Sequence, residues 1–291
     1  PTTIFLFSSF TYDAFVIAFL MLGIALFVTE YLSEEKIKTK RTMLSIFAMI
    51  VGCFSKAVYI PFLALYWLMP KDKFYSRRQK NLFKAGIFVL LILMFASFIL
   101  PLIGNVTSGA EVGDYRGGDT SQTSQLSMIL GYPLTYTGVL LKSLGTTFAS
   151  YFIGSKVLAN FAYRGIYDGI GYFVVLLTML FTFVTDFGMT EKTYDAQMKR
   201  KILMMKIWNA VLIFGTACLV WTALYLDFTP VGSMVINGVS PRYYLPLIFP
   251  LSLIFINQKV RCSMKLENYQ SLIAFLMLIG TGISIYCLML A

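Results

Sequence analysis

The sequence predicts an all-α membrane protein: a polytopic transmembrane helical bundle of about seven or eight membrane helices, with interfacial helices in one outer loop. Hydrophobic residues make up 58% of the 291 positions and charged residues only 13%, against roughly 45–50% and about 25% in soluble domains. The apolar residues come in runs of about 17–22, the length that crosses a hydrocarbon core of roughly 30 Å. A water-soluble fold of this length could not bury so much apolar surface.

The order of the elements follows from these hydrophobic runs. Polar loops separate them and alternate between strongly basic and weakly charged composition. The runs cover 14–31, 42–69, 85–103, 169–186, 207–226, 243–258 and 271–290.

The run 42–69 is too long for one ordinary span and is interrupted by Lys56 and Pro61. Lysine-rich loops flank it on both sides, and a single crossing would place them on opposite faces of the membrane, against the positive-inside bias. We therefore expect a helical hairpin, about 42–55 and 58–69, that turns at 55–57. A single long kinked helix remains the alternative.

The net charge of +10 comes from 24 basic and 14 acidic residues. With the hairpin, most of the basic residues fall in short loops on one face, which the sorting rule assigns to the cytoplasm. This distribution argues against nucleic acid as a partner. Six basic residues fall on the outer side or within its leaflet: Lys56, Arg116, Lys142, Lys156, Arg164 and Arg242.

The longest outer segment, 104–168, is expected to be an extracytoplasmic loop with interfacial helices. It begins with a stretch rich in Gly, Ser, Thr and acids and continues with mixed apolar and small polar residues. Its charged residues Glu111, Asp114, Arg116 and Asp119 are candidates for holding a sugar, although such a run is also typical of a solvated loop.

Lys56 and Arg242 stand out because each flanks a hydrophobic helix, where a charge is costly unless it is paired or hydrated. One interpretation is that both face an aqueous cavity and bind an anion such as a lipid phosphate. The other is that they extend to the outer headgroups or pair with an acid. The candidate acids are Asp13, Asp168 and Asp227.

Two further features bear on function. Tyr12 and Asp13 precede the first span, either as outer-cavity residues or as a helix cap with an interface anchor. The chain has no histidine, and its four cysteines, which lie singly, have no paired spacing. Imidazole-based catalysis, a disulfide framework and a cysteine metal site are therefore not expected in this segment. We expect no cofactor, with a divalent metal left open.

Four blocks in order resemble a bacterial family of multi-spanning proteins, domain of unknown function 2142. They are FSSFTYDAF, SKAVYIPFLAL, QLSMILGYPLTYTGVLLKS and INGVSPRYYLPLIFPL. The chain departs from the family pattern at Pro241, where a glycine is typical. The family is similar to GT-C type glycosyltransferases, which move a sugar from a polyprenyl-phosphate carrier to an outer acceptor by an inverting transfer.

The resemblance implies roles for particular residues. The carrier phosphate would contact Arg242, Lys56 and Tyr243. The substrate or outer cavity would involve Tyr12, Asp13, Tyr59, Asp114 and Arg116. Because such enzymes normally carry the catalytic carboxylate in an early outer loop, and because this chain opens at Pro1 without signal-peptide features, we interpret 1–291 as one transmembrane domain, the C-terminal part of a longer protein. The catalytic residue would then lie upstream.

The expected function is therefore transfer of a sugar from a polyprenyl-phosphate carrier to a cell-envelope glycan, in the bacterial cytoplasmic membrane. The expected partners are membrane lipids, the polyprenyl-phosphate-linked sugar and the glycan acceptor. Two alternatives remain: a transporter, flippase or polymerase-like protein for lipid-linked glycans, and a noncatalytic membrane subunit.

Overall fold

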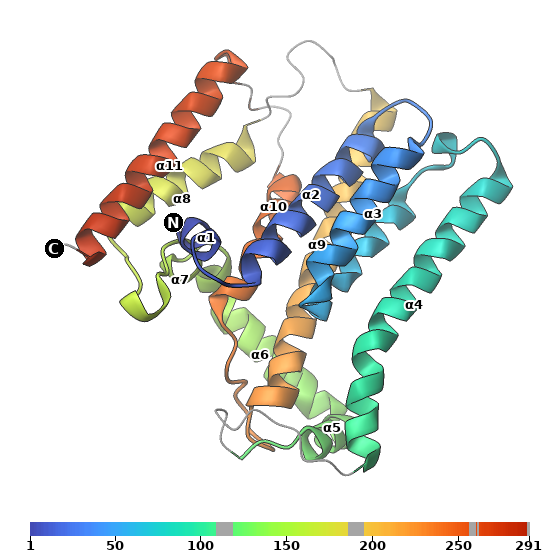
Figure 1. The fold of residues 1–291 in the computed structure, drawn as a ribbon, viewed down its shortest axis with the longest axis vertical. Coiled ribbons are helices and arrows are strands. Elements are labelled where there is room, and N and C mark those ends of the chain that lie inside the picture. The colour runs from blue at the N-terminus through green and yellow to red at the C-terminus, as the bar shows by residue number, and fades with distance from the viewer. Residues whose placement is uncertain (109–118, 186–194, 256–259, 261, 290–291) are drawn as a thin grey trace.

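The computed structural model describes residues 1–108, 119–185, 195–255, 260 and 262–289, and its regular elements in these ranges are helices (Figure 1). In chain order they are α1 (Thr2–Phe7), α2 (Asp13–Leu32), α3 (Thr39–Phe54), η1 (Ala57–Leu68), η2 (Lys71–Lys73), α4 (Arg77–Ser108), α5 (Gln122–Gly131), α6 (Pro133–Phe152), α7 (Ser155–Leu158), η4 (Ala162–Arg164), α8 (Ile170–Val184), α9 (Ala196–Phe228), η5 (Pro241–Tyr244), α10 (Leu245–Phe255) and α11 (Leu266–Met289).

The helical hairpin expected within 42–69 is confirmed, and the single kinked helix is wrong. α3 ends at Phe54 and η1 begins at Ala57, so the chain turns at Ser55 and Lys56 and packs back on α3. η1 is a 3-10 helix that contains Pro61. It lies against α3, α4 and α9, and the Trp208 indole of α9 donates a hydrogen bond of 3.0 Å to the carbonyl oxygen of Ala64. The hairpin therefore forms the centre of the bundle.

α2 and α3 pack closely because small residues line their contact. The Ser45 hydroxyl donates a 2.6 Å hydrogen bond to the carbonyl oxygen of Gly23. A Cβ atom at Gly52 would lie 2.9 Å from the backbone nitrogen of Leu20. Such close approach of two backbones is typical of helix pairs in membranes. It holds the start of α2 beside the turn that follows α3.

α4 and α9 are longer than the expected spans 85–103 and 207–226. With 32 and 33 residues and a rise of 1.5 Å per residue, each is about 50 Å long and exceeds a hydrocarbon core of roughly 30 Å. Because α4 continues to Ser108, the first residues of the expected 104–168 loop are helical.

In the described residues, 4 helices are long and apolar enough to cross a membrane: Asp13–Leu32, Arg77–Leu100, Ala196–Phe228 and Leu266–Leu288. Ala57–Leu68 and Ile170–Val184 are shorter apolar helices. The described residues thus contain several apolar helices, and the expected count of seven or eight spans is not confirmed. Four of the expected spans are shorter helices in the described residues, since α3 has 16 residues, η1 has 12, α8 has 15 and α10 has 11.

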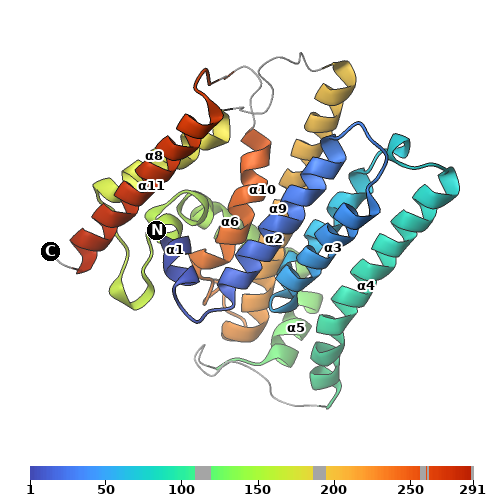
Figure 2. The same ribbon diagram turned by 45° about the horizontal axis from the view of Figure 1, so that its top comes forward.

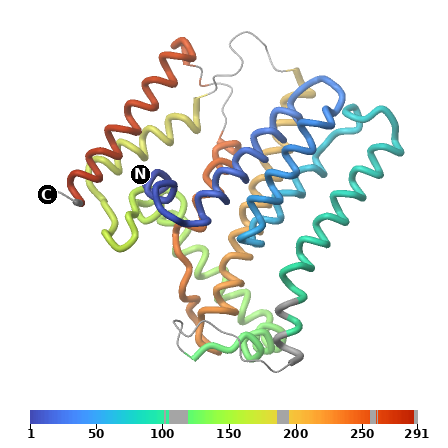
Figure 3. Tube along the Cα trace, in the orientation of Figure 1, coloured from blue at the N-terminus to red at the C-terminus, as the bar shows by residue number. Residues whose placement is uncertain are grey.

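The helices divide into a main bundle and a lateral pair. α8 and α11 lie side by side at one edge in two views, and α4 lies at the opposite edge (Figures 1 and 2). Both chain ends lie on the side of the α8–α11 pair (Figure 3). The α2–α3 loop and the first residues of α4 and α9 gather at one end of the bundle, and α5 lies at the other (Figure 1). We call the first of these the basic end, after the lysines and arginines of its loops.

Candidate functional site

The site begins with Asp13, the first residue of α2. Its side chain is only 5% exposed, and its backbone N–H donates a 3.1 Å hydrogen bond to the hydroxyl of Thr11. A carboxylate is favoured at this position because the N-terminal end of a helix carries partial positive charge. A buried carboxylate also needs cationic or hydrogen-bonding partners, since removing it from water is costly.

Lys56 is the first of these partners. It occupies the turn after α3 with an extended backbone (φ −148°, ψ 96°), and its ammonium group forms a hydrogen-bonded ion pair with Oδ1 of Asp13. Two aromatic rings lie near the same ammonium: the Tyr243 centroid is 4.0 Å away and the Tyr12 centroid 5.0 Å. With its side chain 12% exposed, Lys56 is held tightly in place.

Arg242 is the second cation and is held more loosely. Its Nε atom lies 3.6 Å from Oδ2 of Asp13, and its side chain is 43% exposed. The guanidinium carbon lies 5.6 Å from the centroid of the Tyr243 ring. Among the described residues one carboxylate therefore faces two cations, which gives this part of the cluster surplus positive charge. Arg242 offers several N–H donors in a planar fork that matches phosphate or carboxylate oxygens.

Hydrogen bonds from η1 and α9 hold the segment that carries Arg242. The Tyr59 hydroxyl donates a 2.7 Å hydrogen bond to the carbonyl oxygen of Tyr243, and the Trp221 indole donates one of 2.6 Å to the hydroxyl of Tyr244. Tyr59 is fully buried and is not part of the cavity lining described below. Tyr59 thus fixes the backbone of η5, and its expected place in the outer cavity stays a prediction.

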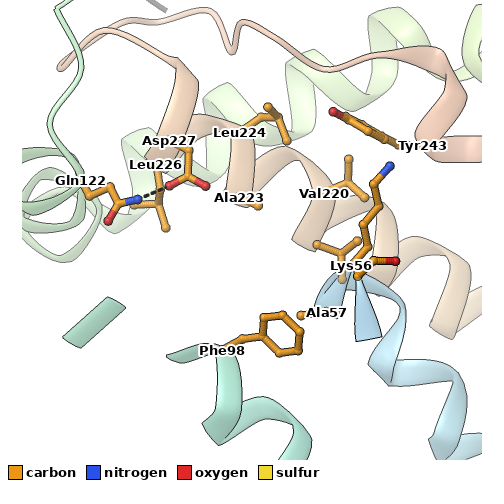
Figure 4. A pocket seen from close by; sticks show the side chains of 12 residues that line it. Lys56, Ala57, Phe98, Gln122, Val220, Ala223, Leu224, Leu226, Asp227 and Tyr243 are labelled. Atoms are coloured by element: carbon orange, nitrogen blue, oxygen red, sulfur yellow. Dashed lines mark hydrogen bonds between the residues drawn. The ribbon is translucent and has the colours of Figure 1, made fainter. Parts of the chain in front are cut away.

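A cavity of about 490 Å³ adjoins the cluster (Figure 4). Lys56 and Tyr243 lie at one end, and the Gln122 amide, hydrogen-bonded to the Asp227 carboxylate, lies at the other. Asp13, Arg242 and Tyr12 do not line this cavity; the first two contact its wall through Lys56 and Tyr243. The lining residues come from η1, α4, α5, α9, η5 and the turn before η1: Ser55, Lys56, Ala57, Val58, Phe98, Gln122, Val220, Ala223, Leu224, Leu226, Asp227 and Tyr243.

The depth of the cluster follows from the length of α2. Twenty residues span about 30 Å, close to the thickness of a hydrocarbon core. The end of α2 lies at the basic end of the bundle, whereas its start lies about halfway along α4 and α9 (Figure 1). Asp13 and its partners are therefore placed near the membrane boundary that is remote from the basic loops.

The structure thus brings together six of the predicted residues, Asp13, Lys56, Arg242, Tyr12, Tyr243 and Tyr59, from three separate segments. Asp114 and Arg116 lie outside the described residues, as does Glu111. Of the three acids predicted as possible partners of the cations, Asp13, Asp168 and Asp227, Asp13 forms the ion pairs with Lys56 and Arg242. Within the described ranges there is no group of three or more Cys, Asp or Glu side chains that could hold a metal ion.

Sequence reasoning missed Gln122 and Phe98, and it named Asp227 only as a possible ion-pair partner. Gln122 lies among several small polar residues and is 105 positions from Asp227 in the chain. Neither hydrophobic periodicity nor charge pattern connects them. Phe98 is one of many aromatic residues on an apolar helix, so nothing local distinguishes it.

Residues 1–251 match the family described as "Predicted membrane protein (DUF2142)". The chain belongs to this family. The DUF2142 region contains the whole cluster and the cavity, together with α2 to α9, and ends within α10. No curated protein and no solved structure matches the chain. The expected family is confirmed, and the similarity to GT-C enzymes and the bacterial origin stay predictions.

Proposed function

We propose that this DUF2142 protein is a glycosyltransferase that takes a sugar from a polyprenyl-phosphate carrier, with the carrier phosphate bound by Arg242 and Lys56. The observation that carries the proposal is the charge imbalance of the cluster, in which the single carboxylate of Asp13 faces two cations beside a cavity. A phosphate would balance the surplus positive charge. The position of the cluster near the membrane boundary suits a ligand whose tail stays in the lipid.

The two cations have different roles in this proposal. Lys56 is fixed by Asp13 and by the two tyrosine rings, so it supplies a preorganised point charge. Arg242 is about half exposed and supplies the fork of N–H donors. As the bond between the anomeric carbon and the phosphate oxygen breaks, negative charge grows on the leaving phosphate, and preorganised cations stabilise it.

The cavity supports a sugar as the transferred group. Its volume of about 490 Å³ falls within the range of roughly 300–1,000 Å³ common for small-molecule sites. The Gln122 amide and Asp227 carboxylate offer hydrogen-bonding groups at the end opposite Lys56, and Phe98 and Leu224 supply apolar surface between the ends (Figure 4).

Asp13 is a positioning residue in this scheme. An inverting transfer needs a carboxylate that removes the proton of the acceptor hydroxyl as its oxygen attacks the anomeric carbon. Both carboxylate oxygens of Asp13 face cations, so this side chain orients Lys56 and Arg242.

The test uses the full-length protein reconstituted in vesicles with a polyprenyl-phosphate hexose labelled in the sugar. We expect Arg242→Ala to reduce the rate at which label is transferred to an acceptor or water about 10²-fold. This is the scale of losing one donor that stabilises developing charge. Arg164→Ala is the matched control, because Arg164 also lies beside the ring of the adjacent tyrosine, Tyr163, but outside the cluster.

Two other results would overturn the proposal of a transferase. Movement of the intact labelled carrier across the bilayer, without release of sugar, would identify a transporter or flippase. Binding of the carrier with neither movement nor release would identify a noncatalytic subunit. In both cases a loss of carrier binding in Arg242→Ala would still locate the phosphate site.

A further inference from the structure

A second cavity lies at the basic end of the bundle, and nothing in the proposed transferase uses it. We propose that it binds an anionic phospholipid from the leaflet on that side, with an acyl chain in the groove between α3 and α4 and the headgroup at the first turns of these two helices.

The groove has the shape and lining for an acyl chain. It has a volume of about 490 Å³, with Met43 and Ile46 of α3 on one side and Phe83, Gly86 and Leu90 of α4 on the other. α3 and α4 each pack on η1, which separates them. A Cβ atom at Gly86 would have no heavy atom within 4 Å. The space between the two helices is therefore open and apolar.

The groove also faces lipid. The side chain of Met43 is 65% exposed, and only 11% of the apolar window of α4 is buried inside the protein. None of the described residues covers these surfaces, so in a membrane they contact hydrocarbon. A lipid chain can thus enter the groove from the side.

One buried polar atom in the groove has no protein partner. Thr42 lines the groove and is 4% exposed, and its hydroxyl oxygen has no hydrogen-bond partner among the described residues. A buried hydroxyl usually finds a partner, since leaving it unpaired costs free energy. The hydroxyl oxygen is covered in this conformation, and rotation of the Thr42 side chain would turn it toward the groove. There an ester oxygen of a glycerophospholipid, between headgroup and acyl chains, could accept its hydrogen bond.

The charge at this end fits an anionic headgroup. α3 begins at Thr39 and α4 at Arg77, and neither helix has an acid in its first turn. The nearby acids are partly neutralised, because Glu35 pairs with Lys38 and Glu30 with Arg41. Further cations flank the same two helix starts, namely Lys40, Arg77, Arg78 and Lys80. Helix N-termini and clustered basic residues both attract phosphate.

The experiment uses the full chain in vesicles that contain a phosphatidylglycerol with a photoactivatable group in one acyl chain, followed by mapping of the labelled peptides. We expect label on 39–46 and 79–90. Gly86→Phe should fill the groove and lower this labelling about tenfold, since an occupied cavity excludes the chain. Gly215→Phe is the matched control: Gly215 also lies within a helix with open space at its Cβ position, and labelling should not change.

A second pair of variants tests the headgroup without altering the groove. Lys40→Gln combined with Arg78→Gln should reduce phosphatidylglycerol labelling about thirtyfold, since each basic residue near a membrane surface contributes about 1 kcal/mol of attraction and the two together about 2 kcal/mol. Lys199→Gln combined with Arg200→Gln removes the same charge from the start of α9 and should change it less than about twofold.

Three results would overturn the proposal. Equal labelling by a phosphatidylcholine probe would show an ordinary lipid contact without headgroup selection. Unchanged labelling in Gly86→Phe would show that the chain does not lie in this groove. Conversion of a dimer to a monomer by Gly86→Phe would show that a second copy of the protein fills the groove instead.

Discussion

The two ends of α2 each bury one carboxylate, and the two carboxylates are satisfied in different ways. Glu30, 1% exposed, accepts a 3.0 Å hydrogen bond from the backbone N–H of Lys38 and lies 3.5 Å from Arg41. Asp13, 4% exposed, lies between Lys56 and Arg242, which come from separate segments. Glu30 forms an ion pair with one cation, Arg41, and closes a short loop, and the buried Lys73 lies near it. Asp13 forms ion pairs with two cations.

This difference separates a structural ion pair from a candidate binding site. Burial alone does not distinguish the two carboxylates, because both are almost fully covered. The distinguishing features at the Asp13 end are the surplus positive charge, the half-exposed guanidinium of Arg242 and the adjoining cavity.

The largest expected effect is on stability when the central acid is removed. Asp13→Asn leaves the Lys56 ammonium, only 12% exposed, without its carboxylate, so we expect a loss of about 3 kcal/mol in unfolding free energy. Glu30→Gln should cost less, about 1–2 kcal/mol, because Arg41 is 31% exposed and can turn to water. Denaturant unfolding in micelles measures both, with the exposed Glu267→Gln as control. Equal losses at the two ends would contradict the comparison.

The second effect concerns the spacing that brings Asp13 and Lys56 together. Gly52→Val places a side chain against the backbone of Leu20, and overpacking of this kind costs about 1–3 kcal/mol. We expect lower thermal stability together with weaker binding of the carrier. Gly282→Val, where a Cβ atom has no heavy atom within 4 Å, should leave both unchanged. Weaker binding in both variants would show that the loss does not come from the α2–α3 contact.

The third effect compares the two arginines. Arg242→Lys keeps the charge but removes the planar fork, and we expect the affinity for polyprenyl phosphate to fall about tenfold, the equivalent of one charge-assisted hydrogen bond. Arg41→Lys should leave this affinity unchanged, because Arg41 pairs with Glu30 at the other end of α2. Vesicle flotation with labelled carrier gives both affinities. An unchanged affinity in Arg242→Lys would show that the fork is not used.

The smallest effect concerns the aromatic rings. Tyr243→Leu removes the ring 4.0 Å from the Lys56 ammonium and should weaken carrier binding by about 0.5–1 kcal/mol. Tyr75→Leu is the counterpart at the basic end, where the Lys36 ammonium lies 5.8 Å from the ring of Tyr75, and should have no effect on binding. The same flotation assay checks the pair, and a tenfold loss in the Tyr75 variant would reverse the comparison.

The sequence predicted the α3–η1 turn at Lys56 because a physical rule acts on it directly: charge sorting disfavours lysine-rich loops on both faces. The same rule singled out Arg242. It did not identify Glu30 as buried, since Glu30 is followed closely by Glu34 and Glu35 and the segment has the composition of a solvated loop. The Gln122–Asp227 contact could not be predicted either, because it depends on how α5 packs against the last turns of α9.

The placement of the two acids along α2 also makes the protein sensitive to bilayer thickness. Asp13 and Glu30 are separated by a helix length of roughly 25 Å, so their clusters lie at the two boundaries only when the acyl chains of the host lipid match this separation. Lipids with longer chains would surround Asp13, Lys56 and Arg242 with hydrocarbon, or force the membrane to thin locally. The proposed phosphate site should therefore work best within a limited range of acyl-chain lengths.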